Sequence, residues 1–166
     1  FLFVAVFVGY AVGSAPIVSF HYGARNHAEV HNLYQKSLRL IAVVSVTMTA
    51  ASMVIIPHVA HIFVGYDAQL LALTSRAFRL YALCFLIKGF NIYASSFFTA
   101  LGDGVTSALI SFLRTFLFQM AALLLLPALW GLDGVWLAVT AAELATLAVT
   151  VYMFVTKDQK FHYRHV

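Results

Sequence analysis

Five long apolar stretches constrain the fold of this chain more than any other feature of its sequence. Each is about 20 residues or longer, which is the length that an α-helix needs to cross a hydrocarbon layer of about 30 Å. The expected spans cover residues 1–22, 40–65, 78–101, 105–127 and 133–156. Because only helices and closed barrels satisfy their backbone hydrogen bonds in lipid, stretches of this length predict an all-α integral membrane protein with about five spans.

Composition and charge agree with a membrane location. Hydrophobic residues make up 63% of the chain and charged residues only 10%, whereas soluble domains are nearer half apolar and a quarter charged. Most of the charged residues behind the net charge of +4 lie near the span ends, which favours contact with membrane lipids over a nucleic acid partner. Cys84 is the single cysteine, so neither an intrachain disulfide nor a zinc site of the multi-cysteine type is expected. No other metal site and no cofactor is predicted. Phe1 begins inside an apolar run, so we expect a fragment that lacks its amino-terminal part.

The distribution of positive charge predicts an orientation. Residues 23–39 and 157–166 together hold six Lys and Arg, whereas residues 66–76 hold one and residues 127–134 none. Since basic residues accumulate on the cytoplasmic side, we expect a multi-pass plasma-membrane protein with a cytoplasmic carboxy terminus. Residues 23–39, the turn at 102–105 and the tail should share that face. Apolar residues at helical spacing within 23–39 predict a separate amphipathic helix along the interface.

Polar residues inside the spans are the candidate functional residues, because charges deep in a bilayer are costly and face a bundle interior or a water-filled cavity. Lys88 and Glu143 each lie about ten residues from the outer end of their span, or about 15 Å deep. Two interpretations stay open for them: an ion pair that pins two helices together, or a midplane binding and coupling site. Asn91 shares a helix face with Lys88. Arg114 lies deeper than an arginine that reaches for the interface.

Gly9 and Gly13 stand four residues apart in the first span, the small-xxx-small spacing that lets helices approach closely. Pro16 follows them and removes a backbone donor, which predicts a kink. The first span is therefore expected to be either a kinked packing face or a bent helix beside a cavity.

Four segments resemble a known family. They are GSAPIVSFHYGA (13–24), FNIYASSFFTALGD (90–103), LISFLR (109–114) and LLPALWGLDGVWLAVTAAE (125–143). Their order and spacing resemble the carboxy-terminal half of the multidrug and toxin extrusion (MATE) transporters, from the eighth helix to the twelfth. These transporters share a superfamily with the lipid-linked oligosaccharide flippases.

The resemblance implies five helices of a six-helix lobe in a twelve-helix, two-lobe transporter, whose amino-terminal lobe would be the partner of this chain. It also implies export of amphipathic, often cationic compounds by antiport with H⁺ or Na⁺. Some members carry a carboxylate on the tenth helix, where this sequence places Asn91. An amide can ligate an ion through its carbonyl but cannot take up a proton, so Glu143 is the best titratable candidate in this chain. In other members the coupling acid lies in the amino-terminal lobe, which would fit an asparagine at position 91.

Two alternatives to drug efflux remain. A lipid flippase of the same superfamily would line its cavity with cations, for which Lys88 and Arg114 are available. A non-transporting structural membrane fragment would simply bury the same polar residues between helices. An enzyme is not expected, because Glu143 is the only acid within a span and no nucleophile, metal cluster or carboxylate pair accompanies it.

Overall fold

The structure, a computed structural model, describes residues 2–163, and this part of the chain is all-helical with no strand. The helices are α1 (Leu2–Gly23), α2 (His27–Val64), α3 (Ala68–Ala82), α4 (Phe85–Ala100), α5 (Gly104–Phe112), the π-helix η1 (Leu113–Phe118), α6 (Gln119–Trp130) and α7 (Leu132–Phe161). Four helices are long and apolar enough to cross a membrane, and α3 with α4 forms a fifth candidate, bent by 41°. The chain is therefore a multi-pass membrane protein of four to five spans, in agreement with the predicted fold class.

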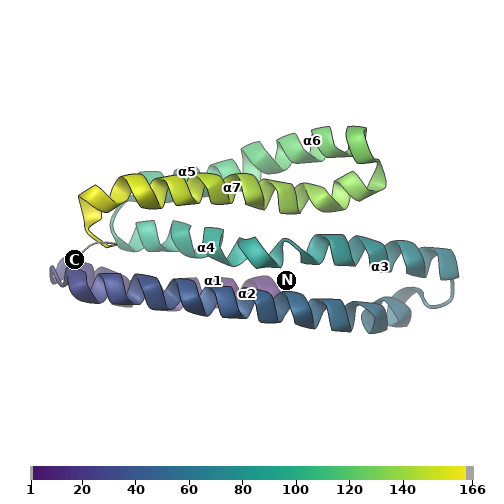
Figure 1. Ribbon diagram of the computed structural model, residues 1–166, viewed down its shortest axis with the longest axis horizontal. Coiled ribbons are helices and arrows are strands. Elements are labelled where there is room, and N and C mark those ends of the chain that lie inside the picture. Colours follow the sequence, from purple (N-terminus) through teal and green to yellow (C-terminus); the bar gives the residue numbers. More distant parts are fainter. Residues whose placement is uncertain (1, 164–166) are drawn as a thin grey trace.

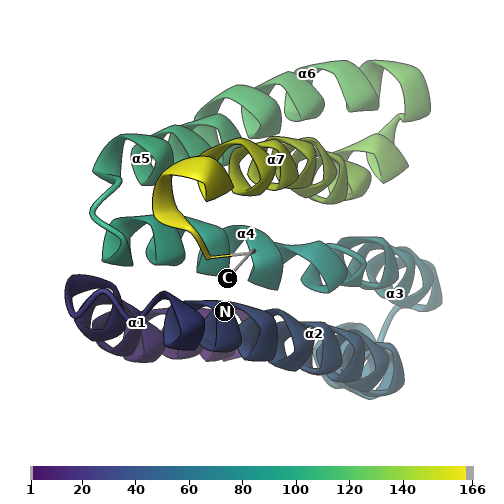
Figure 2. The same cartoon turned by 60° about the vertical axis from the view of Figure 1, so that its left-hand side comes forward.

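Helix α4 occupies the middle of the bundle. Figures 1 and 2 show it between a pair formed by α1 and α2 on one side and a group formed by α5, α6 and α7 on the other. Its side chains are correspondingly buried, and Tyr93, Ala94, Phe97 and Phe98 are each at most 1% exposed. Asn91, which lies on the same helix and is 0% exposed, is thus enclosed by the other spans.

Helix α2 differs from the expected boundaries. The separate interfacial helix predicted within 23–39 is absent, because α2 runs without interruption from His27 to Val64 and does not begin at residue 40. Asn26 caps its first turn by accepting a hydrogen bond from the backbone N–H of Glu29 at 3.1 Å. No glycine or proline follows before Pro57, so nothing ends the helix near residue 40. At about 1.5 Å per residue, the 38 residues extend about 57 Å, well beyond the hydrocarbon layer.

The span expected at 78–101 is a broken one. Helix α3 begins at Ala68, ten residues earlier than expected, because Asp67 caps it by accepting bonds from the N–H groups of Gln69 and Leu70. The break lies at Leu83 and Cys84, where backbone bonds of the tighter i to i+3 type replace the regular ladder. No proline or glycine lies at this break, and its sequence carries no signal from which it could be predicted.

The last two spans are longer than predicted. The fourth covers Gly104–Trp130, so Pro127 lies inside its final helix rather than at its end, and η1 forms a π-helical section in its middle. The fifth, α7, continues to Phe161 instead of ending near residue 156. Gly134 allows the turn between α6 and α7 to be tight, since a Cβ there would lie 2.2 Å from the carbonyl oxygen of Leu126.

Close helix packing depends on a different glycine from those expected. Gly9 and Gly13 are exposed, and a Cβ added at either would meet nothing within 4 Å in the described part of the chain. A Cβ at Gly89 on α4 would instead lie 2.6 Å from ring carbons of Phe7 on α1. Pro16 is also exposed, and α1 remains one helix through it. Gly9 and Gly13 therefore pack against none of the described helices, and their role in close helix packing stays a prediction.

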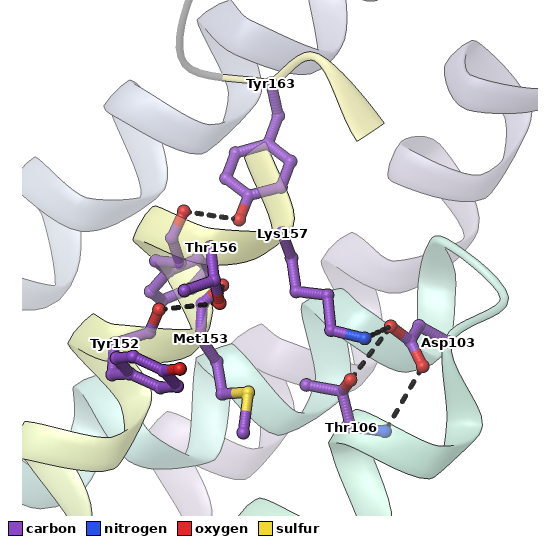
Figure 3. A network of polar contacts seen from close by, with 8 residues as sticks. Asp103, Thr106, Tyr152, Met153, Thr156, Lys157 and Tyr163 are labelled. Atoms are coloured by element: carbon purple, nitrogen blue, oxygen red, sulfur yellow. Dashed lines mark hydrogen bonds and ion pairs between the residues drawn. The ribbon is translucent and has the colours of Figure 1, made fainter. Parts of the chain in front are cut away.

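One end of the bundle is held together by polar contacts. The Asp103 carboxylate caps α5 through the Thr106 N–H at 3.2 Å and lies 3.1 Å from the Lys157 ammonium on α7, as Figure 3 shows. Burial alone would raise the pKa of Asp103, but the hydrogen bonds from Thr106 and the Lys157 charge outweigh burial and hold this pKa below its usual value. The α4–α5 turn is thereby fixed to the end of α7.

Tyr163, the last residue that the structure describes, lies over the same end. Tyr163 is fully buried, its hydroxyl donates to the carbonyl of Phe154 at 2.7 Å (Figure 3), and its own carbonyl lies 2.8 Å from Nδ1 of His31 on α2. Residues 23–39, the α4–α5 turn and the end of α7 therefore meet at one end of the bundle (Figure 1), as the charge pattern predicts. Which side of a membrane this end faces stays a prediction.

Candidate functional site

A buried polar cluster joins the middle of α4 to the middle of α7. Asn91 on α4 is 0% exposed and Glu143 on α7 is 4% exposed. The Asn91 amide nitrogen donates to the Glu143 carboxylate Oε2 at 2.8 Å and to the Glu143 backbone carbonyl at 2.9 Å. Both amide protons are therefore used, and Asn91 on α4 orients the Glu143 carboxylate on α7.

Lys88 completes the charge balance of this cluster. Its ammonium nitrogen lies 3.6 Å from Glu143 Oε1, so the two carboxylate oxygens have different partners, a cation and an amide. The Lys88 side chain is 14% exposed, and its ammonium lies over the ring of Tyr81 at 5.7 Å. The structure thus brings Lys88, Asn91 and Glu143 together, which agrees with the predicted depth of the two charges.

Thr150 is a member of the cluster that the sequence did not single out. It lies two helical turns after Glu143 on α7, is 1% exposed, and its hydroxyl donates to the Asn91 carbonyl oxygen at 3.0 Å. This bond leaves one lone pair of the amide oxygen for a further partner. The spacing of seven residues between Glu143 and Thr150 places both on one helix face, which is the signal that could have identified it.

A groove lies on the other side of Thr150. Its volume is about 330 Å³, and it is bounded by Tyr34 and Leu38 of α2, Phe90 of α4, and the α7 face from Leu147 to Val155. The lining is almost entirely apolar and aromatic. An apolar surface therefore begins one side chain away from the polar cluster in the described part of the chain.

Arg114 is not part of this cluster. It lies in η1, half-buried, and forms no hydrogen bond or ion pair with Lys88, Asn91 or Glu143 among the described residues. Its Nη1 is buried and has no hydrogen-bond partner there. The four polar candidates therefore divide into one joined group of three and one separate cation.

Sequence inspection also missed a group of four hydroxyls between α4 and α5. Ser95 Oγ lies 2.9 Å from Ser107 Oγ and 2.8 Å from Ser111 Oγ, and the Thr99 hydroxyl donates to Ser107 Oγ at 2.7 Å. The four residues form two pairs spaced four apart, 95 with 99 and 107 with 111, and this spacing was the available signal.

The fold and the buried cluster define a class: a bundle of membrane-spanning helices with charged and polar side chains enclosed at its centre. Comparison with known proteins identifies the family. The MatE family matches residues 1–124, which is most of the chain, and the chain belongs to this family. No curated protein matches the chain.

Solved structures show the same architecture. The chain is similar to an outward-facing multidrug resistance MATE family transporter of the MOP superfamily, with a TM-score of 0.87 and 19% identity over 97% of this chain and 36% of that one. An inward-facing structure described in the same terms gives a TM-score of 0.87 and 18% identity over 99% and 38% of the two chains. A MATE in complex with MaL6 gives 0.85 and 19% over 97% and 37%. The chain thus spans little more than a third of the length of these structures.

Proposed function

We propose that this chain forms most of one lobe of a secondary active transporter that exports amphipathic, often cationic compounds in exchange for H⁺ or Na⁺. The observation that carries the proposal is the enclosed cluster of Lys88, Asn91 and Glu143 at the centre of the bundle. A carboxylate paired with an ammonium group and an amide can take up or release a cation by exchanging partners, which is what a coupling site needs.

In this scheme, Glu143 is the group that binds the coupling ion, and Lys88 competes with that ion for the carboxylate. Asn91 fixes the carboxylate through its amide protons and can offer its carbonyl oxygen to Na⁺. Because Asn91 itself cannot be protonated, Glu143 would be the residue of this cluster that carries the proton in proton coupling. The apolar groove beside Thr150 supplies aromatic surface next to the cluster, which suits the apolar part of an amphipathic substrate.

The proposal is tested by ethidium efflux from cells that express the intact transporter, with the pH gradient and the Na⁺ gradient collapsed in turn. Efflux that stops when one gradient is removed is the expected result, and it names the coupling ion. No efflux from a well-folded protein under either gradient would reject drug export and favour the lipid-flippase alternative. The two deep cations Lys88 and Arg114 support that alternative.

A further inference from the structure

We propose that Arg114 and Ser111 form a binding subsite for an oxyanion, a carboxylate or phosphate group carried by an amphipathic molecule. The first observation concerns charge. Lys88, Arg114 and Glu143 are the charges deep in the spans, and Lys88 already neutralises Glu143 at 3.6 Å. Arg114 is left without an ion pair among the described residues, although a half-buried guanidinium in a membrane span is costly unless something neutralises it.

The second observation is the position of Arg114 on its helix. The inward-facing stripe of this span runs through residues 107, 111, 114, 118 and 122, which are buried or half-buried, whereas residues 115–117 are exposed. Arg114 therefore lies on the side of η1 that faces the bundle and not the lipid. It lies three residues after Ser111, which is half-buried on the same inward-facing stripe. Such π-helical sections occur frequently at functional sites.

The third observation concerns the hydroxyl group nearest to Arg114 along the chain. Ser111 Oγ lies 2.8 Å from Ser95 Oγ, and either hydroxyl can be the donor of this bond. The Ser95 hydroxyl also lies 3.3 Å from the Ser107 carbonyl and 2.9 Å from Ser107 Oγ. When Ser95 donates to Ser111, the Ser111 proton is available to a ligand, beside the Nη1 donor of Arg114 that has no partner among the described residues.

These donors define the chemistry of the ligand. Arginine presents several N–H groups in a plane and binds carboxylate and phosphate with two parallel hydrogen bonds, and a hydroxyl can supply a third. A cationic substrate would be repelled by Arg114, so this subsite adds acidic and zwitterionic amphiphiles to the range of the proposed transporter. The subsite is separable from the proposed transport function, because its occupancy is measured as binding at equilibrium.

The experiment uses the purified intact transporter and two probes with the same aromatic body: a rhodamine with a free carboxylate, and the methyl ester of that rhodamine. Fluorescence polarisation gives the Kd of each. Wild-type protein should prefer the acid. In Arg114→Gln the Kd of the acid should rise about tenfold, or about 1.4 kcal/mol, and the Kd of the ester should change by less than twofold. Ser111→Ala should also raise the Kd of the acid, by about threefold.

Two controls accompany these variants. Arg79→Gln removes an exposed arginine on α3 and should change neither Kd. Arg114→Lys keeps the charge but loses the two-pronged geometry, and should recover part of the preference for the acid.

A second arm adds phosphatidylglycerol or phosphatidylcholine to the wild-type protein. Displacement of the acid by the anionic lipid alone assigns the subsite to a lipid phosphate, and displacement by neither lipid assigns it to a carboxylate cargo.

Three results would overturn the proposal. The first is equal affinity of the wild-type protein for the acid and the ester, which includes no measurable binding of either. The second is an equal loss of both affinities in Arg114→Gln. The third is a lower melting temperature in Arg114→Gln with unchanged dye selectivity, which would show that Arg114 pairs with another part of the transporter. Failure of ethidium efflux would reject drug export without affecting any of these measurements.

Discussion

The amide nitrogen of Asn91 lies 2.8 Å from the Glu143 carboxylate, across the interface between the central helix and the last helix of the bundle. It is the only side-chain amide donor to that carboxylate in the described part of the chain, and Lys88 is the only cation paired with it there. The two oxygens of the Glu143 carboxylate therefore have their side-chain partners on a single helix, α4.

Replacing Asn91 with leucine should destabilise the protein. The substitution keeps a similar volume but removes both bonds to Glu143 and the acceptor of Thr150, so buried polar atoms lose their partners. The expected loss is about 2–3 kcal/mol in the apparent free energy of unfolding in detergent micelles. Thr156→Ala is the matched control, because the Thr156 hydroxyl is exposed and bonds only to its own helix. Equal losses of stability in the two variants would contradict the claim that the buried hydrogen bonds of Asn91 stabilise the protein.

A double-mutant cycle on Lys88 and Glu143 should reveal their pairing directly. Lys88→Met leaves a buried carboxylate without its cation, and Glu143→Gln leaves a buried ammonium without its anion, so each single variant should lose stability. The double variant should lose less than the sum of the two, with an interaction energy of about 1–3 kcal/mol. Additive losses would mean that the 3.6 Å separation carries no energetic coupling.

Gly89→Ala should disturb the contact between α1 and α4. The added Cβ would meet the Phe7 ring at 2.6 Å and the Ile41 Cγ2 at 3.0 Å, so the helices must shift or the ring must move. We expect a loss of about 1–3 kcal/mol in unfolding free energy. Gly9→Ala is the matched control within α1, where a Cβ meets nothing among the described residues and alanine favours the helix. A larger loss in Gly9→Ala than in Gly89→Ala would reverse this assignment.

The number and class of the spans follow from the sequence because apolar length is a local property that each stretch carries by itself. Helix ends follow less well. Asp67 and Asp103 are capping residues that mark helix starts, yet the early start of α3 was missed, because residues 68–76 are not apolar enough to read as a span.

Some contacts within the site were predictable from the sequence and others were not. Depth along the helices brought Lys88 and Glu143 to one level, so their pairing was predictable as one of two interpretations. The bonds of Asn91 and Thr150 depend on how α4 and α7 are rotated against each other, which no local pattern specifies. Gly89 illustrates the same limit: its neighbours Phe7 and Ile41 come from two other helices, and no spacing within α4 indicates them.

The Asp103–Lys157 contact predicts a dependence of stability on acid. Because the pKa of Asp103 in the folded protein is lowered, its contribution is present above the unfolded pKa of about 3.9 and is lost as the pH falls through the folded value. Asp103→Asn should cost about 1 kcal/mol at pH 7 and should lose less stability than the wild type on acidification below about pH 4. Melting temperatures from pH 7 to pH 3 measure both. If the melting temperatures of the wild type and Asp103→Asn fall in parallel with pH, the Asp103 carboxylate does not contribute to stability as described. Asp133→Asn is the control, because Asp133 lies in an exposed pair with Arg76.

Glu143→Gln in the intact transporter, reconstituted in proteoliposomes, tests most directly whether Glu143 couples ion movement to transport. Ethidium transport is measured under an imposed pH or Na⁺ gradient, with Glu29→Gln as a variant of an acid outside the buried cluster. We predict that Glu143→Gln loses gradient-driven transport while its Kd for ethidium stays within about threefold, or about 0.7 kcal/mol, of the wild type. Transport at the wild-type rate with unchanged ion dependence would remove Glu143 from the mechanism.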